Sequence, residues 1–276
     1  MLLGVSPVLI SWLPRFLGKK LVINIDGLEW KRAKWSKIVS FFLKLSERLA
    51  GTFCNQVVTD SLVIQRYYHE KYKKSSVYIP YGADIIEDSN ENALKKYGLE
   101  KGRYILQVCR IEPENNVHLV MREFSKTGTG LDLVILGDNR YDTAYIRLLK
   151  SFRNPKVKFL GAIYGDDYKS ILKNAYCYVH CHEVGGTNPA LLEAMGAAKC
   201  VLVLDVPFNL ETIEDAGIPF SKEEDDLANK LKDLVENPTR LIHYERKAVE
   251  RIKEAYIWEK IIDQYESLFL RVLDEK

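Results

Sequence analysis

The 276-residue sequence lacks several features that would place it in a specialised class of proteins. It has no run of about 18 apolar residues, which excludes a membrane-spanning helix. Met1–Leu13 is uncharged, but it has neither the basic region nor the small-residue cleavage site of a secretory signal. With 40 basic and 38 acidic residues, the charge is too balanced to indicate a nucleic-acid partner. A hydrophobic content of 47% is that of a globular protein, and the length allows two domains or one large one.

The sequence also lacks a CxxC pair, and its five cysteines are odd in number. Most of them lie in apolar, strand-like runs, which predicts reduced cysteines packed as small hydrophobic side chains in a cytosolic protein. Cys181 stands between His180 and His182, a pattern that raises a metal site as an alternative. Adjacent residues on a strand point to opposite faces, so we predict no metal there.

From Tyr104 onward, short apolar runs alternate with segments of helical spacing. Strands that are apolar at nearly every position indicate a parallel sheet covered on both faces. We therefore predict an α/β, doubly wound domain of the Rossmann type. The predicted strands are Tyr104–Ile111, Leu131–Gly137, Val157–Ile163, Ala175–Cys181 and Cys200–Val206, and the predicted helices include Asp142–Phe152, Asp166–Asn174 and Pro189–Ala198.

The first hundred residues form a thinner pattern, with predicted strands at Leu21–Ile25, Gln56–Thr59 and Ser76–Pro80 and one long helix at Trp35–Ala50. The polar stretch Asp88–Gly102 is the expected linker. Lys222–Lys276 predicts two or three amphipathic helices, with Ile257, Ile261, Ile262, Tyr265, Leu268 and Val272 at helical spacing. We predict an incomplete N-terminal domain at residues 1–90, a second domain at 91–256 and a C-terminal helix at 257–276 that returns to the first domain.

The most informative motif is the segment from Glu183 to Met195, which follows a predicted strand and runs into a helix. Asn188 suits the N-cap and Pro189 the first helical position. Gly185 and Gly186 permit close approach to the backbone, and the free N–H groups of a helix start favour a diphosphate. Glu193, one turn into the helix, is placed to bind a ribose diol. The alternative is an ordinary strand-to-helix turn with a surface glutamate.

A second candidate is Arg110, at the end of a predicted strand, where ligands bind in open parallel sheets. Its guanidinium suits a pair of phosphate oxygens. The alternative is a surface arginine paired with Glu112 or Glu114. The two glycines at 128 and 130 precede their strand instead of following it, which argues against a dinucleotide-binding dehydrogenase.

The order of Arg110 and Glu193-Ala-Met195, with strands and helices alternating between them, resembles the donor domain of GT-B glycosyltransferases of the family 4 type. Further stretches resemble its rhamnosyltransferase-like branch. They are Asn24–Trp35 (NIDGLEWKRAKW), Tyr81–Asp84 (YGAD), Gly185–Pro189 (GGTNP) and Asp205–Asn209 (DVPFN). The resemblance covers nearly the whole chain.

The resemblance implies transfer of a sugar from a nucleotide-sugar substrate, with no metal and no cofactor, in a cleft between two Rossmann-like domains. Arg110 would contact the diphosphate, Glu193 the ribose, and the Gly185–Thr187 segment the diphosphate and the donor sugar. The loop after Phe159-Leu-Gly161 would face the base. The reacting sugar would meet Asp26 and Gly27, the candidate catalytic residues.

The chain departs from the family pattern at three places. Gly185 replaces the first of two paired glutamates, with Glu183 two residues away. Asn115 replaces a phosphate-binding lysine, so we expect Lys199 or another base to compensate. The glycine-rich start of the family is absent. We therefore expect either a second polypeptide packed on Met1–Leu13 or a misplaced start.

One predicted helix interleaves basic and aromatic residues, a pattern found on helices that lie on anionic membranes. The residues are Lys31, Arg32, Lys34, Trp35, Lys37, Phe41, Phe42 and Lys44. The alternative is an ordinary amphipathic helix with solvated lysines. The expected location is therefore the cytoplasm. If this helix contacts a membrane, the protein would lie at the inner face of that membrane.

Together with these residues, the resemblance implies a metal-independent hexosyl- or rhamnosyltransferase that extends a surface polysaccharide or a lipid-linked glycan. Two alternatives remain. One is a non-catalytic nucleotide-sugar-binding subunit that docks to a partner. The other is a nucleotide-sugar epimerase or hydrolase, for which His118 and His182 are the nearby acid–base candidates.

Overall fold

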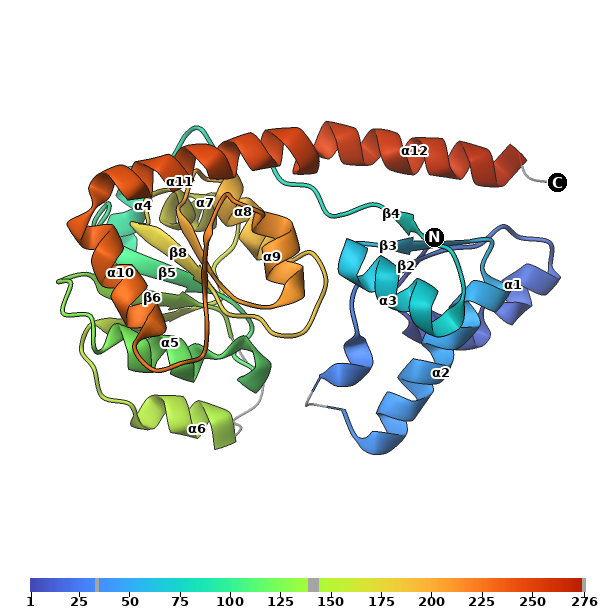
Figure 1. Cartoon of the computed structure of the whole chain (residues 1–276), viewed down its shortest axis with the longest axis horizontal. Coiled ribbons are helices and arrows are strands. Elements are labelled where there is room, and N and C mark those ends of the chain that lie inside the picture. The colour runs from blue at the N-terminus through green and yellow to red at the C-terminus, as the bar shows by residue number, and fades with distance from the viewer. Residues whose placement is uncertain (33–34, 139–143, 275–276) are drawn as a thin grey trace. The chain divides into compact units, whose positions relative to one another are not determined.

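The structure, a computed structural model, describes residues 1–32, 35–138 and 144–274. The chain divides into two compact units. The first unit consists of Met1–Gly82, Val184–Asn188 and Tyr256–Lys276, and the second of Ala83–Glu183 and Pro189–Ala255. Each unit has its own parallel sheet (Figure 1), in agreement with the predicted α/β class.

The sheet of the first unit has four parallel strands in chain order. They are β1 (Leu2–Leu3), β2 (Val22–Ile25), β3 (Gln56–Thr59) and β4 (Val77–Tyr78). The predicted strands match β2, β3 and β4. The sequence analysis missed β1, which pairs Leu2 with Ile23, because a strand of two residues leaves no pattern of its own. Since the strands are parallel, the segments that follow them emerge at one edge of the sheet.

Helices α1 (Trp12–Phe16), α2 (Lys37–Phe53) and α3 (Leu62–Tyr72) and 3-10 turns at Ser6–Ile10 and Glu29–Lys31 connect these strands. Ser36 caps α2 by accepting a hydrogen bond from the N–H of Val39 (3.4 Å). The last helix, α12 (Trp258–Asp274), covers the sheet through Ile261, Leu268 and Val272. Ile262 was predicted on this stripe but is 59% exposed. It directly follows Ile261, and consecutive residues of a helix do not share a face, whereas residues three or four apart do. Lys34, one of the basic residues predicted on the helix that corresponds to α2, lies outside the described residues.

The sheet of the second unit has six parallel strands in the order β10-β9-β8-β5-β6-β7. They are β5 (Tyr104–Val108), β6 (Asp132–Leu136), β7 (Val157–Gly161), β8 (Cys177–His180), β9 (Val201–Leu204) and β10 (Ile218–Phe220). The five strands predicted from Tyr104 onward correspond to β5 through β9. The edge strand β10 was missed because it is short and contains Pro219, which lacks a backbone donor.

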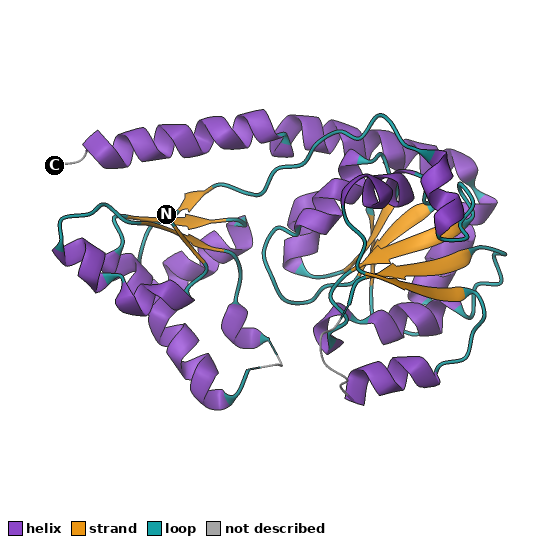
Figure 2. Ribbon diagram, turned by 180° about the vertical axis from the view of Figure 1, so that it is seen from behind, coloured by secondary structure: helices purple, strands orange, loops and turns teal. Residues whose placement is uncertain are grey.

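Helices cover both faces of this sheet, as Figure 2 shows. They are α4 (Glu91–Lys96), α5 (Val117–Phe124), α6 (Ala144–Ser151), α7 (Gly165–Lys173), α8 (Pro189–Gly196), α9 (Pro207–Ile213), α10 (Asp226–Glu236) and α11 (Pro238–Arg251), followed by a π-helical turn at Ile252–Tyr256. The helix predicted at Asp142–Phe152 corresponds to α6, and its residues 142 and 143 lie outside the described part.

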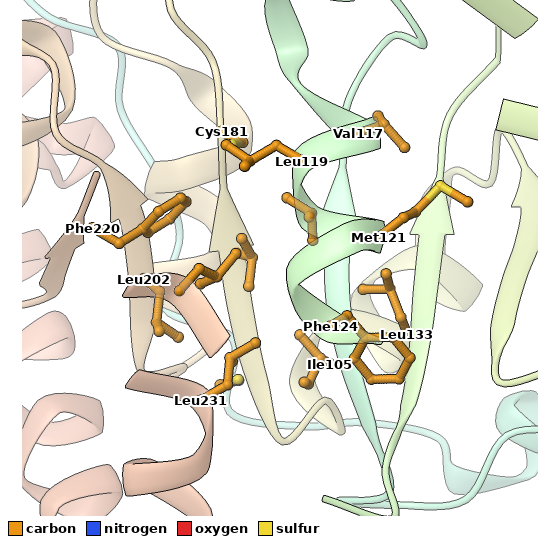
Figure 3. Packing of buried hydrophobic residues seen from close by; sticks show 14 of the residues in the cluster. Ile105, Val117, Leu119, Met121, Phe124, Leu133, Cys181, Leu202, Phe220 and Leu231 are labelled. Carbon is orange, nitrogen blue, oxygen red and sulfur yellow. The ribbon is translucent and has the colours of Figure 1, made fainter. Parts of the chain in front are cut away.

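The core of the second unit lies between the sheet and the helices α5 and α10 (Figure 3). Ile105, Leu133 and Leu202 of the strands are completely buried there. Phe124 of α5 and Leu231 of α10 pack into the same cluster. Burial of such side chains is the main favourable term in folding, and it fixes the strands whose ends carry the candidate site.

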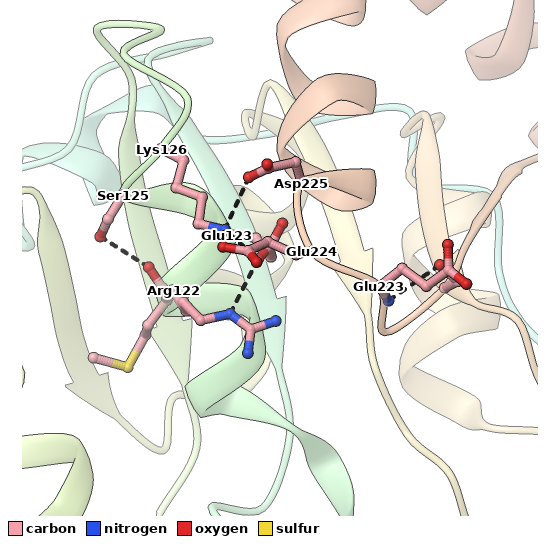
Figure 4. Close-up of polar contacts among 9 residues, drawn as sticks. Arg122, Glu123, Ser125, Lys126, Glu223, Glu224 and Asp225 are labelled. Atoms are coloured by element: carbon pink, nitrogen blue, oxygen red, sulfur yellow. Dashed lines mark hydrogen bonds and ion pairs between the residues drawn. The ribbon is translucent and has the colours of Figure 1, made fainter.

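A charged cluster fixes α5 to the start of α10 (Figure 4). The carboxylate of Glu123 is buried and accepts a hydrogen bond from Arg122 Nε (3.1 Å). Lys126 Nζ lies 3.3 Å from the same carboxylate and also binds Glu224 (2.9 Å) and Asp225 (2.8 Å). Pairing with cations offsets the cost of burying this charge. The cluster holds the helix that follows β5.

The stretch Asp88–Gly102, expected to be a linker, is part of the second unit and contains α4. Asn90 caps this helix by accepting from the N–H of Asn92 (3.0 Å), and Ala93 and Leu94 are buried. The linker prediction was wrong because two apolar residues in one turn anchor an otherwise polar helix. Upstream, the N–H of Ile86 donates to the carbonyl of Gly196 (3.0 Å). Residues 83–90 were expected in the first domain, but they belong to the second unit.

Candidate functional site

The sheet of the second unit reverses its winding between the neighbouring strands β5 and β8. From β5 the order continues to β6 and β7, and from β8 it continues in the opposite direction to β9 and β10. In doubly wound sheets, the carboxyl ends of the strands at such a reversal form the crevice where ligands bind. The residues that directly follow β5 and β8 are therefore the first candidates for function.

Arg110 follows β5 and presents its side chain to solvent, with 56% of it exposed. The nearest acidic group is the carboxylate of Glu112, whose Oε2 lies 3.9 Å from Arg110 Nη2. This distance exceeds that of a hydrogen bond, and an exposed ion pair of this kind stabilises little. The predicted alternative of a pair with Glu112 is thus present only as a loose contact, and among the described residues no hydrogen bond holds the guanidinium.

Two asparagines shape the loop between β5 and α5. Asn115 is buried, and its side-chain amide donates to the carbonyl of Arg110 (2.7 Å). Asn116 has a left-handed backbone, with φ of 51°, and donates to the carbonyl of Cys181 after β8 (3.0 Å). Asparagine tolerates this conformation better than most residues. Asn115 therefore supports the backbone of Arg110, while its direct contact with a donor stays a prediction.

Glu193 lies on α8 and is held by a phenol from α7. The hydroxyl of Tyr168 donates to Glu193 Oε2 at 2.6 Å. Burial, with the neighbouring Tyr178 and the charge of Glu193, raises the pKa of Tyr168, so the hydroxyl keeps its proton. One carboxylate oxygen is thus anchored, and the orientation of the other follows from it. The predicted ribose contact of Glu193 stays a prediction.

Three aromatic side chains, on alternate positions of β8 and of the residues that directly follow it, form a column beside this pair. The ring centroids of Tyr178 and His180 are 6.1 Å apart, and those of His180 and His182 are 4.3 Å apart with planes at 16°. His180 is completely buried, and this burial lowers its pKa, so the ring is neutral. Tyr178 donates to the carbonyl of Val108 (3.3 Å), two residues before Arg110. The column therefore braces the end of β5.

Cys181 points away from both histidines into the apolar cluster on the other face of the sheet. Among the residues that the structure describes, no group of three or more His, Cys, Asp and Glu side chains is arranged to hold a metal ion. All five cysteines lie in the described part, and each is buried and unbridged. Burial raises the pKa of Cys54 to about 11, so this thiol keeps its proton near neutral pH.

The predicted compensating base, Lys199, does not lie at the candidate site. It precedes β9, at the amino edge of the sheet, and donates to the carbonyl of Ala175 (3.1 Å) and to Glu245 (3.1 Å). Instead, Lys222 follows β10 at the carboxyl edge and forms an ion pair with Glu183. Sequence reasoning missed Lys222 because it lies far along the chain from β8.

In the first unit, Asp26 and Gly27 follow β2, and the segment Gly185–Thr187 lies against them. Gly27 has φ of +131°, and a Cβ there would lie 3.1 Å from the Cα and carbonyl carbon of Gly185. Partial loss of hydration raises the pKa of Asp26, with the charge of Glu29 adding to the shift. The two predicted catalytic positions and the predicted glycine segment are thus brought together in one unit.

Asp60, which follows β3, holds the same segment and was missed by sequence reasoning. The hydroxyl of Thr187 donates to the carbonyl of Asp60, and both residues are buried. A Cβ on Gly186 would overlap the carboxylate of Asp60, so this glycine is required by packing within the protein. Partial burial raises the pKa of the half-buried Tyr81, and the charges of the nearby Asp26 and Asp60 raise it further. The carboxyl edge of the first sheet therefore concentrates acidic groups around the segment.

The structure thus distributes the predicted site residues over two groups. Asp26, Gly27, Gly185, Gly186, Thr187 and Asn188 belong to the first unit, and Arg110, Asn115 and Glu193 to the second. Helix α8 begins at Pro189, as predicted, while the N-cap role of Asn188 stays a prediction.

Comparison with known protein families identifies the second unit. A family described as glycosyl transferases group 1 matches residues 89–255, more than half of the chain. The chain belongs to this family. A second family, described as a domain of unknown function (DUF1972), matches residues 13–84 of this group 1 member. The match to group 1 spans both Arg110 and Glu193, and it confirms the predicted glycosyltransferase family at this level.

Two known proteins resemble this group 1 member in sequence. An N-acetylgalactosamine-N,N'-diacetylbacillosaminyl-diphospho-undecaprenol 4-alpha-N-acetylgalactosaminyltransferase of Campylobacter jejuni is 24% identical over 179 residues, or 63% of the chain. The matched part is 48% of that enzyme, so the chain spans about half of its length. An uncharacterized glycosyltransferase of Methanocaldococcus jannaschii is 22% identical over 275 residues, which are 94% of the chain and 70% of that protein.

Solved structures share the fold of this group 1 member. The Anabaena protein HepE, crystallised with UDP-glucose, is 16% identical with a TM-score of 0.84, and the match covers 97% of the chain and 77% of HepE. The sucrose-phosphate synthase of Thermosynechococcus elongatus is 17% identical with a TM-score of 0.84, and the match covers 99% and 73%. These likenesses, together with the two parallel sheets, confirm the predicted GT-B type of fold.

Proposed function

We propose that this protein transfers a sugar from a nucleotide diphosphate sugar to a glycan or a lipid-linked acceptor. Its family membership and its likeness to two known proteins support this, since HepE was crystallised with UDP-glucose and the Campylobacter jejuni enzyme is named for a diphospho-undecaprenol-linked acceptor. Within the family we assign the chain to the rhamnosyltransferase-like branch of the family 4 type. Its motifs GGTNP at 185–189 and NIDGLEW at 24–30 support this assignment.

The observation that carries the proposal is the pair of groups beside the strand reversal of the second unit. Arg110 offers an exposed guanidinium, and Glu193 offers a carboxylate that Tyr168 orients. A guanidinium binds a diphosphate through two parallel hydrogen bonds and stabilises the charge that develops as the diphosphate departs. A carboxylate accepts hydrogen bonds from both hydroxyls of a ribose. The pair therefore fits a nucleoside diphosphate.

Catalysis in this proposal is mostly positioning and electrostatic stabilisation of the leaving group. Asp26 and Gly27 are the proposed contacts to the reacting sugar. The raised pKa of Asp26 makes its carboxylate a stronger base, which suits acceptance of a proton from an attacking hydroxyl. The proposed reaction uses no metal ion. We further propose that the protein acts in the cytoplasm and that it takes part in surface polysaccharide synthesis.

The proposal is tested by titrating UDP, TDP and GDP into the purified chain in a calorimeter. We expect one diphosphate to bind, and Arg110→Ala and Glu193→Ala each to weaken it by about tenfold or more. Arg246→Ala and Glu250→Ala are matched controls, because these residues form an exposed pair on α11. If neither Arg110→Ala nor Glu193→Ala changes the affinity for the diphosphate, the donor site is assigned to the wrong residues.

The same titration separates the alternatives. Failure of all three diphosphates to bind would favour a docking subunit, or a chain that cannot hold its donor site without a partner. If one diphosphate binds, incubation of the corresponding nucleotide sugar without an acceptor distinguishes the remaining classes, because an epimerase or hydrolase converts it and a transferase leaves it intact. In the structure, His118 hydrogen-bonds to Tyr145 (2.9 Å) and His182 stacks on His180.

The second polypeptide expected on Met1–Leu13 stays a prediction. Ile10, Trp12 and Leu13 are exposed there, and Phe16 and Leu17 continue the exposed apolar stretch. Co-purification of the chain with proteins from its native source, with Trp12→Ser as the comparison, would test it.

A further inference from the structure

Helix α2 of the first unit (Figure 1) exposes large apolar side chains in addition to those that it buries. Its inner face buries Leu43, Ser46, Glu47 and Ala50. Its outer face exposes Ile38 (71%), Phe41 (63%) and Phe42 (49%). An ordinary surface helix carries polar side chains opposite its buried stripe, so this outer face departs from the expected pattern.

The outer face is a continuous strip because its residues recur at helical spacing. Ile38, Phe41 and Phe42 are three and four residues apart, so their side chains are neighbours on the helix surface. The rings of Phe41 and Phe42 lie edge to face, with centroids 5.8 Å apart. The exposed Trp35 lies just before the helix, with its indole N–H bound to Glu29 (3.1 Å). We call Trp35, Ile38, Phe41 and Phe42 the outer strip.

The exposed charges on α2 all have the same sign. Lys37, Lys44 and Arg48 are exposed, and together with Phe41 they recur at helical spacing along one border of the outer strip. The one acidic residue of the helix, Glu47, is buried and accepts hydrogen bonds from Trp30 Nε1 (3.0 Å) and the Tyr67 hydroxyl (2.8 Å). It therefore does not offset the positive border toward solvent.

This local charge stands out against the rest of the chain. Residues 1–50 contain nine basic and three acidic residues, whereas the remainder contains 31 basic and 35 acidic residues. A chain with a net charge of only +2 thus concentrates its positive charge in its first 50 residues, which include most of α2. Positive charge combined with exposed aromatic side chains complements an anionic lipid surface, which offers negative headgroups and an apolar interior.

We propose that the outer strip of α2 docks this protein on an anionic phospholipid bilayer. The side chains of Ile38, Phe41 and Phe42 enter the boundary between headgroups and acyl chains, and Lys37 and Arg48 contact the lipid phosphates. Within the described residues no helix is long and apolar enough to cross a membrane, so the contact is with one leaflet. The inference rests on the proposed function in one respect, because docking brings the enzyme to a lipid-linked acceptor.

The docking surface is tested by sedimenting the full chain with vesicles made of equal parts of phosphatidylglycerol and phosphatidylcholine, and with vesicles of phosphatidylcholine alone. We expect binding to the anionic vesicles that weakens as salt is added, because salt screens exposed charges. We expect the partition coefficient onto the anionic vesicles to fall about tenfold in each of two double variants, Phe41→Ser/Phe42→Ser and Lys37→Gln/Arg48→Gln. Lys44 is left intact because its ammonium lies 4.2 Å from the ring centroid of Trp30 and supports the packing there.

The matched control is Ile262→Ser/Leu273→Ser, which removes two apolar side chains of similar exposure, 59% and 68%, from α12. Binding by this control should equal that of the parent chain. The proposal is overturned if the anionic vesicles are not bound, or if binding survives loss of the two phenylalanines but is lost with Phe16→Ser on α1. It is equally overturned if ultracentrifugation without vesicles shows self-association that Phe41→Ser/Phe42→Ser abolishes, since the strip would then bind a second copy.

UDP titration of the same variants keeps the two proposals separate. Variants of the outer strip should bind the diphosphate like the parent chain, because α2 carries none of the proposed donor-binding residues. Vesicle binding with no diphosphate binding would refute the proposed function and leave the lipid surface standing. Diphosphate binding with no vesicle binding would do the reverse.

Discussion

The contact between Tyr168 and Glu193 offers the sharpest test of how the candidate site is organised. Tyr168→Phe removes only the hydroxyl that donates to Glu193 Oε2 at 2.6 Å and keeps the aromatic ring. Hydrogen bonds to charged groups contribute about 1.5–3 kcal/mol. Glu193 is half-buried, so water replaces part of this bond, and we expect the free energy of unfolding to fall by about 1 kcal/mol.

The effect on ligand binding follows from the orientation of the carboxylate. Without the phenol, Glu193 samples several rotamers, and ordering one of them again upon binding costs about 0.5–1.5 kcal/mol. We therefore expect the Kd for the preferred nucleoside diphosphate to rise about three- to tenfold, measured by calorimetry. In the double variant with Glu193→Gln, the effects should be less than additive, since both changes disrupt the same contact.

Tyr97→Phe is the matched control, because the Tyr97 hydroxyl donates to a carboxylate oxygen of Asp167 (2.7 Å) in the first turn of α7. It removes the same kind of bond from the same helix, and it should leave the Kd unchanged. The reasoning is refuted if Tyr168→Phe leaves the Kd unchanged while Glu193→Gln raises it. It also fails if Tyr97→Phe weakens binding as much as Tyr168→Phe does.

Three further predictions concern stability and are measured by urea unfolding. Gly186→Ala should lower the free energy of unfolding by about 1–3 kcal/mol, because the added Cβ overlaps the Asp60 carboxylate, and an unchanged midpoint would contradict this packing. Leu202→Ala should lower it by about 2–5 kcal/mol, since the side chain is fully buried in the core of the second unit, and a loss below 1 kcal/mol would show that the core collapses around it. Burial lowers the folded-state pKa of His180 below its usual 6.5, so the unfolded chain binds the proton more tightly and stability falls as the pH drops below about 6.5, by up to about 1.4 kcal/mol per pH unit. The stability of His180→Phe should fall less between pH 7 and pH 5, and an identical pH dependence in the two proteins would show that His180 makes no such contribution.

The strand pattern of the second unit could be predicted because it is local in sequence. Buried parallel strands are apolar at nearly every position, and β5, β6, β7, β8 and β9 each leave such a run. The start of α8 was equally visible, since Pro189 suits the first turn of a helix. Among the elements that were missed, β1, α4 and β10 have two, six and three residues, too few for a periodic signal.

The candidate residues at strand ends, Arg110 and Asp26, were also predictable, because a position after a parallel strand is a position at the ligand-binding edge. Gly186 was expected to make room for a ligand, whereas the structure gives it a packing reason in the carboxylate of Asp60. The compensating base was expected at Lys199, but topology places that residue at the opposite edge of the sheet and brings Lys222 to Glu183 instead.

The sequence by itself thus determined the fold class, the order of the strands along the chain and the residues that end them, since each of these depends on neighbours a few positions away. Only the tertiary structure decided which groups support those residues. Tyr168 meets Glu193 across 25 positions, Asn116 meets Cys181 across 65, and Thr187 meets Asp60 across 127. Contacts of this kind arise when the crossover helices and loops return to the sheet, and they leave no periodic trace in the sequence because neither partner constrains its own neighbours.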